Sequence, residues 1–148
     1  MAISIDRHAP EVPGATMPGP HALVFYKVTC PTCQMAAPAI DGFEGAYPGR
    51  IRGVGQDPPG ALASFAERWG LSFPSVPDLD PFEASNAYGI AHVPTIVVVD
   101  AGGLVAGVVE SWDRDATNRA SANLASLLGV EPATISAEGD GLPAFRPG

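Results

Sequence analysis

An apolar run that leads directly into a closely spaced cysteine pair is the feature that most constrains this chain. Residues 22–28 are apolar and partly β-branched, which predicts a buried strand. Cys30 and Cys33 follow at once, and residues 34–46 carry apolar side chains at helical spacing, with a kink expected at Pro38. The order strand, Cys-Pro-Thr-Cys, helix therefore puts the first cysteine just before the start of a helix.

The rest of the chain predicts further strands and helices in alternation. Further strands are expected at 51–55, 94–100 and 104–110, and helices at 58–70, at 82–88 and from Asp113 or Asp115 to about Leu128. The glycines after Asp100 suit a hairpin between the last two strands. A parallel first half and an antiparallel second half predict an α/β fold: a mixed sheet with helices on both faces.

The length of 148 residues fits one folded domain. Residues 1–20 are rich in proline and glycine and are expected to be irregular. Residues 21–129 are expected to form the domain. Residues 130–148 are polar and rich in proline and glycine, which predicts a weakly ordered C-terminal tail.

The cysteine pair has the spacing that thiol–disulfide exchange requires. One thiolate attacks a disulfide and a second thiol resolves the mixed disulfide, and two intervening residues let both sulfurs meet across one helical turn. The unpaired N–H groups at a helix start favour the thiolate of Cys30, so we assign Cys30 as nucleophile and Cys33 as resolving thiol. Alternatives are a structural pair or half of a metal site. The three histidines show no ligand spacing, so we expect no metal and no cofactor.

A second element, Val93-Pro94-Thr95, opens the clearest strand of the sequence. A trans proline can simply begin a strand. A cis bond at Pro94 would instead bring the backbone of Val93 beside the cysteine pair, free to pair with a substrate strand. The sequence alone leaves both readings open.

Together the two elements resemble the thioredoxin superfamily, above all its membrane-tethered or exported reductases and the alkyl hydroperoxide reductase/thiol-specific antioxidant group. The resemblance covers about residues 22–129 and implies a thioredoxin fold, a redox-active pair with general antioxidant or redox-homeostasis roles, and a cis Pro94 facing that pair. The matching motifs are Phe25-Tyr26 before Cys30-Pro31-Thr32-Cys33, Gly55-Gln56-Asp57, Ala87-Tyr88-Gly89-Ile90 before Val93-Pro94-Thr95, and Val99-Asp100 with Gly103.

Three departures from thioredoxin narrow the function. Thr29 stands where thioredoxins have tryptophan, Val24 replaces a buried aspartate, and Pro31-Thr32 replaces Gly-Pro. The first two argue against a general thioredoxin with many partners. The third departure tunes the redox potential of the pair.

Two other functions compete with the oxidoreductase. A peroxiredoxin-like peroxidase shares Cys30-Pro31-Thr32, but Lys27 stands where that group has threonine or serine, and its arginine is missing near Val93-Pro94. A non-enzymatic binding module of the same fold is the other. His92 and Lys27 are candidates for tuning the Cys30 thiolate, although a loop role for His92 and a solvent-facing role for Lys27 compete with this.

Charge and composition bear on partners and location. The net charge of −8 disfavours nucleic acid and anionic membranes as partners. We expect a protein disulfide or small thiol as substrate and a thiol as electron donor. Residues 1–20 lack the apolar block of a signal peptide, which predicts a cytoplasmic protein and hence a reductase, although a chain whose leader had been removed would look the same.

Overall fold

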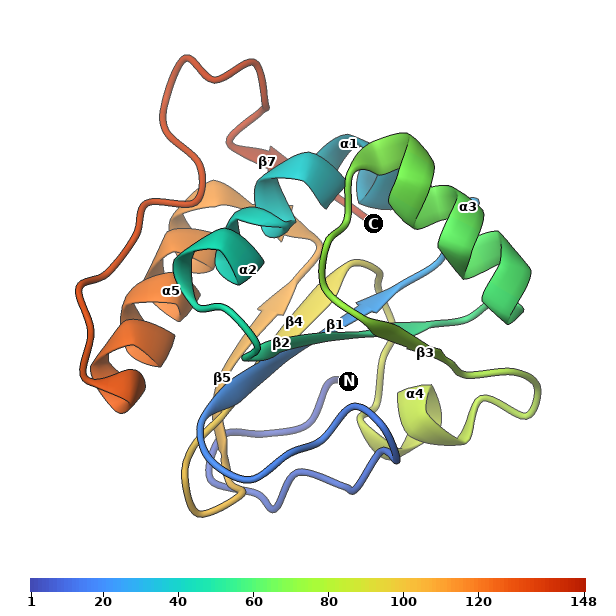
Figure 1. The fold of residues 1–148 in the computed structure, drawn as a ribbon, viewed down its shortest axis with the longest axis horizontal. Helices are drawn as coiled ribbons and strands as arrows, with labels where there is room; N and C mark the ends of the chain where they lie inside the picture. Colours follow the sequence, from blue (N-terminus) through green and yellow to red (C-terminus); the bar gives the residue numbers. More distant parts are fainter.

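Five strands form the central sheet of the computed structural model, which describes residues 1–148 (Figure 1). They lie in the order β3-β2-β1-β4-β5, with β1, β2 and β3 parallel and β4 antiparallel to both β1 and β5. Their bounds are β1 His21–Tyr26, β2 Ile51–Gly55, β3 Ser75–Pro77, β4 Thr95–Val99 and β5 Val105–Glu110. The mixed sheet predicted from the sequence is confirmed.

The central strand β1 is buried on both of its faces, which explains its unbroken apolar sequence. Val24 and Tyr26 point into a larger core beneath the helices, whereas Leu23 and Phe25 point into a smaller core on the other face. Alternating side chains of one strand therefore hold the two layers of the molecule together.

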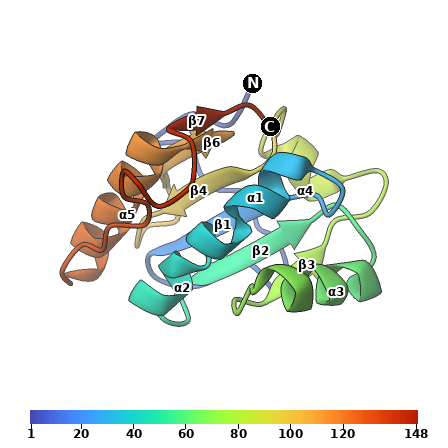
Figure 2. The same cartoon turned by 90° about the horizontal axis from the view of Figure 1, so that it is seen from above.

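Helices cover the two faces of the sheet unequally. Their bounds are α1 Pro31–Ile40, α2 Gly42–Ala46, α3 Pro59–Trp69, α4 Glu83–Ala87 and α5 Arg114–Leu128. Helices α1, α2, α3 and α5 pack on one face, and short α4 and the N-terminal segment cover the other (Figures 1 and 2). Helices on both faces are thus confirmed. No helix has the length and apolar composition needed to cross a bilayer.

The helix after the cysteine pair differs from its prediction at its start and in its middle. It begins earlier, at Pro31, because proline suits a first turn where no N–H donor is needed. It is also interrupted at Asp41, so that α1 and the five-residue α2 replace one kinked helix. Pro38 lies inside α1, three residues before the interruption, on an exposed position where its ring meets solvent.

The C-terminal tail makes specific contacts, unlike the weakly ordered segment that its composition suggests. Residues 145–146 form a short strand, β7 (Phe145–Arg146), which pairs with β6 (Trp112–Asp113). Buried or half-buried side chains of the domain, such as Tyr47 and Asn118, bond to main-chain groups of the tail. Arg114 adds an ion pair with Asp140 at 3.2 Å. The division at residues 20 and 129 stays a prediction.

Candidate functional site

The loop between β1 and α1 is fixed by hydrogen bonds from both sides. The carboxylate of Asp57, in the loop after β2, accepts the N–H of Val28 at 2.9 Å. The side-chain amide of Gln34 donates to the carbonyl of Val28 at 2.8 Å. The N–H of Cys30 donates to the carbonyl of Lys27 at 3.1 Å. The cysteine at the helix start is therefore held in place by its own loop.

Cys30 caps α1 through its sulfur. The backbone there is extended, and the Sγ atom accepts the N–H of Cys33 at 3.3 Å. The thiol also donates to the carbonyl of Val93 at 3.4 Å, and its residue is partly exposed. The Cys30 sulfur therefore lies at the positive end of the α1 dipole, where a helix N–H points at it.

Cys33 lies one turn further on and is only 2% exposed. Burial raises the pKa of its thiol well above the ordinary value, because the apolar surroundings solvate a thiolate poorly. The negative charge of Asp57 acts in the same direction. Both cysteines are free thiols in the structure. The pair thus combines a reachable sulfur with a protected one.

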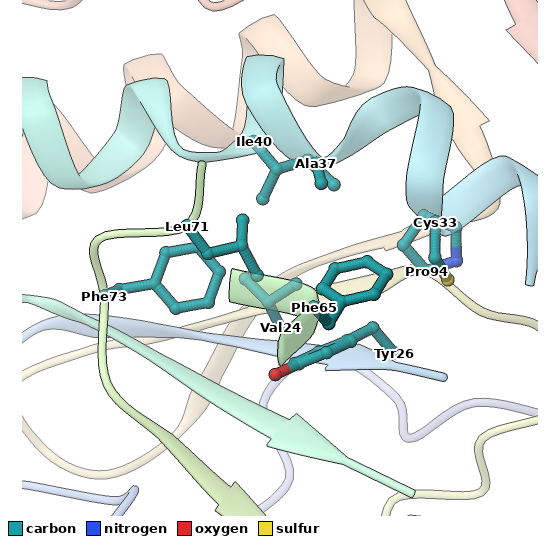
Figure 3. Close-up of a pocket in the computed structure, with 9 residues that line it drawn as sticks. All are labelled: Val24, Tyr26, Cys33, Ala37, Ile40, Phe65, Leu71, Phe73 and Pro94. Carbon is teal, nitrogen blue, oxygen red and sulfur yellow. The ribbon is translucent and has the colours of Figure 1, made fainter. Parts of the chain in front are cut away.

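A small apolar pocket of about 10 Å³ lies next to Cys33 (Figure 3). Cys33 and Pro94 meet at one end of it, and Val24 lines it where thioredoxins carry an aspartate. The full lining is Val24, Tyr26, Cys33, Ala37, Ile40, Phe65, Leu71, Phe73 and Pro94. No carboxylate reaches this pocket, so any proton leaving Cys33 goes to another acceptor.

The Val93-Pro94-Thr95 loop lies against the cysteine pair. The Val93–Pro94 peptide bond is cis, as the resemblance implies. Pro94 is buried, and its carbonyl accepts the N–H of Ser111 at 2.9 Å. The hydroxyl of Thr95 donates to the carbonyl of His92 at 2.6 Å, which closes the loop. The backbone of Val93 is therefore fixed next to Cys30.

The side chains of His92 and Lys27 do not bond to the sulfur atoms. Both residues are exposed, and no hydrogen bond joins either side chain to a cysteine. Only the main chain of Lys27 takes part in the site, through its carbonyl. Their roles in tuning Cys30 stay predictions. No three side chains of the histidine, cysteine, aspartate or glutamate type converge anywhere in the structure.

Three further residues reach the site that the sequence did not single out as functional. Asp57 could have been found, since it follows a parallel strand beside β1, and the carboxyl ends of parallel strands share one edge of a sheet. Thr32 and Ser111 bond to residues 147 and 148 of the tail. No local sequence pattern predicts these hydrogen bonds between residues so far apart in the chain.

The chain is similar to known oxidoreductases in sequence and in structure. No family model matches it. It is 30% identical over 92 residues to the thiol-disulfide oxidoreductase ResA of Halalkalibacterium halodurans, covering 58% of this chain and 51% of ResA. The chain thus spans about half the length of that curated relative.

Two solved mycobacterial structures share both fold and sequence with the chain. MTB dsbF is 26% identical, with a TM-score of 0.62 over 75% of this chain and 82% of its own. A secreted Mycobacterium tuberculosis disulfide oxidoreductase homologous to E. coli DsbE is 25% identical, with a TM-score of 0.60 over 74% of this chain and 82% of its own.

These similarities correct one prediction and confirm another. The prediction of a cytoplasmic location is wrong, because the chain is similar to a secreted Mycobacterium tuberculosis disulfide oxidoreductase and no comparison points to the cytoplasm. That prediction rested on the composition of residues 1–20 alone. The predicted thioredoxin fold is confirmed by the sheet order and by the matching structures. In sequence and in fold the chain is similar to thioredoxin-like thiol–disulfide oxidoreductases.

Proposed function

We propose that this chain exchanges disulfides through Cys30 and Cys33, with Cys30 as nucleophile and Cys33 as resolving thiol. The observation that carries the proposal is the asymmetry of the pair. Cys30 is partly exposed and accepts a helix N–H, whereas Cys33 is 2% exposed one turn away. A substrate reaches only the first sulfur, and the second is close enough to release it.

The reaction runs in two exchange steps. The Cys30 thiolate attacks one sulfur of a substrate disulfide, so that a mixed disulfide forms and the other substrate sulfur leaves and takes up a proton. Cys33 then loses its proton and attacks the Cys30 sulfur. The Cys30–Cys33 disulfide forms, the mixed disulfide breaks, and the second substrate thiol is released. Two electrons pass from the protein to the substrate, and a thiol donor restores the dithiol.

The substrate is proposed to be a protein disulfide or a small disulfide, held against Val93, Pro94 and Thr95. The carbonyl of Val93 contacts Cys30 and is fixed by the loop, so a bound chain would lie beside the nucleophile. The reductase direction stays a prediction, and the argument for it from location no longer applies. The potential of the pair relative to its donor decides the direction.

The peroxidase alternative is not favoured. Lys27 is exposed and offers no hydroxyl to orient a peroxide, and the relatives named above are oxidoreductases of disulfides. The same comparisons give no support to a module without activity.

The test is dithiothreitol-driven reduction of insulin. The wild-type protein should accelerate it, Cys30→Ser should abolish the acceleration, and Cys33→Ser should accumulate a mixed disulfide at Cys30. Ser126→Ala, an exposed position on α5, serves as the control and should behave like wild type. Activity that survives in Cys30→Ser would rule out the assignment of the nucleophile.

A further inference from the structure

The C-terminal segment Pro143–Gly148 crosses the edge of the candidate site. The carbonyl of Pro143 accepts the indole N–H of Trp112 at 2.8 Å, and the carbonyl of Ala144 accepts the N–H of Arg114 at 2.9 Å. Strand β7 then leads the segment toward the start of α1 (Figure 2). The segment therefore ends where the two cysteines lie.

The last two residues of the segment contact the site directly. The hydroxyl of Thr32, between the cysteines, donates to the carbonyl of Pro147 at 2.7 Å. The N–H of Gly148 donates to the hydroxyl of Ser111 at 3.1 Å. A Cβ atom built on Gly148 would come within 1.8 Å of the Val93 carbonyl oxygen, the atom that accepts the Cys30 thiol. Chain atoms thus cover the backbone beside the nucleophile.

The two hydroxyls that hold the segment are buried and have no other partner. Thr32 is 3% exposed and Ser111 is 9% exposed, and each side chain makes its one hydrogen bond to the segment. Buried polar groups are costly when unpaired, so these hydroxyls need a main-chain partner or water at this place. Because both hydroxyls bond to main-chain atoms, they can form the same hydrogen bonds with the main chain of another extended peptide.

The segment Pro143–Gly148 is held weakly enough to be displaced from the site. All six residues from Pro143 to Gly148 are exposed. Arg146 reaches only the sulfur of Met35, at 3.6 Å. Near the cysteines the segment is held by two hydroxyls and a short two-residue strand pair, rather than by a packed apolar anchor. Such a contact opens at low cost.

We propose that Thr32 and Ser111 bind the main chain of an extended substrate segment across Cys30, and that Pro143–Gly148 occupies this position until a substrate displaces it. The inference rests on the proposed function. It assigns two specificity-determining hydroxyls and a class of substrate. That class is an extended peptide with a glycine opposite Val93, because even a Cβ atom there would come within 1.8 Å of the Val93 carbonyl oxygen.

The kinetic test compares the full chain with two variants and a matched control. One variant ends at Ala144, which removes residues 145–148 but keeps the bonds of Pro143 and Ala144. The second is Gly148→Ala, which forces the end of the segment off Val93. The control is Gly60→Ala, the same change where a Cβ meets open space. Loss of the two hydroxyl hydrogen bonds and of the β6–β7 pairing predicts a reaction with insulin that is at least about tenfold faster for the truncated protein.

Gly148→Ala should also react faster, and Gly60→Ala should match wild type. A truncated protein and a Gly148→Ala variant that react at the wild-type rate, or more slowly, would overturn the inference. If insulin is reduced by none of these proteins, the proposed function fails instead. Gly148→Ala keeps the test decisive should the truncated chain fold poorly.

A binding measurement does not depend on activity. The synthetic peptide Phe-Arg-Pro-Gly, with the sequence of residues 145–148, is titrated into the truncated protein and followed by NMR. Amide shifts should move at Thr32, Val93 and Ser111, and Thr32→Val should weaken the binding several-fold. A peptide that leaves the amide shifts of these three residues unchanged would refute the proposed binding position.

Discussion

The burial of Cys33 makes the stability of the reduced protein depend on pH in a specific way. Its thiol is 2% exposed among apolar side chains, and burial raises its pKa far above the ordinary value of 9.0. The folded protein therefore keeps a proton that the unfolded chain loses in alkali. By linkage, this stabilising contribution is fully present below pH 9 and is lost as the pH rises from there toward the folded pKa.

The size of the effect follows from the unfolded chain alone, as long as the folded thiol stays protonated. With an ordinary pKa of 9.0, moving from pH 7 to pH 10 favours the unfolded state by about 1.4 kcal/mol through this one group. Cys33→Ala removes the titration. The wild-type protein should therefore lose about 1.4 kcal/mol more stability over this range than the variant does.

The assay is urea unfolding under a phosphine reductant at pH 7, 8, 9 and 10, followed by the fluorescence of buried Trp112. Tyr88, whose pKa burial also raises, is present in both proteins and cancels in the comparison, and so does Tyr26 as long as the folded Cys33 thiol stays protonated. The cavity left by Cys33→Ala cancels as well, because it is the same at each pH. Parallel pH profiles for the two proteins would refute the burial of Cys33 and the protected role that depends on it.

Three structural contacts give further predictions, each checked by urea unfolding at pH 7. Asp113→Ala should lower the free energy of unfolding by about 1 kcal/mol, because this carboxylate caps α5 by accepting the N–H of Ala116. Asp115→Ala should cost less, because Asp115 lies two residues further on, in the first turn, and makes no such bond. Tyr47→Phe should cost about 2 kcal/mol, since its buried hydroxyl joins α5 to the tail. Gly55→Ala should cost about 2 kcal/mol and shift α3, since the new methyl group would lie 2.3 Å from a side-chain carbon of Leu62. An unchanged urea midpoint for any of these three variants would show that the contact concerned is not made in solution.

The sequence predicts the fold well because its signals are local and agree with one another. The apolar run of β1, the proline and glycine limits of α3, and the glycine hairpin before β5 each report on a few neighbouring residues. The interruption at Asp41 is missed, because a proline predicts a disturbance of a helix more reliably than the residue at which the helix stops.

The site is predictable only as far as its motifs reach. The spacing of Cys30 and Cys33 identifies them as a redox pair, and the family resemblance predicts the cis bond at Pro94. The bond from Asp57 to Val28 spans 29 residues, and the bond from Thr32 to Pro147 spans 115. Asp57 could be placed near the site from the parallel pairing of β1 and β2, whereas no local pattern pairs Thr32 with Pro147, so only the folded chain brings those two together. The tail differs from its prediction for the same reason.

The central claim is that Cys30 and Cys33 act as one two-electron couple. The direct measurement equilibrates the protein with glutathione buffers of graded potential and counts free thiols by alkylation and mass spectrometry. The account predicts that both thiols disappear together, with a tenfold change in the oxidised-to-reduced ratio for about every 30 mV. Two thiols that oxidise independently, or glutathione that stays attached to Cys30 in the wild-type protein, would contradict it.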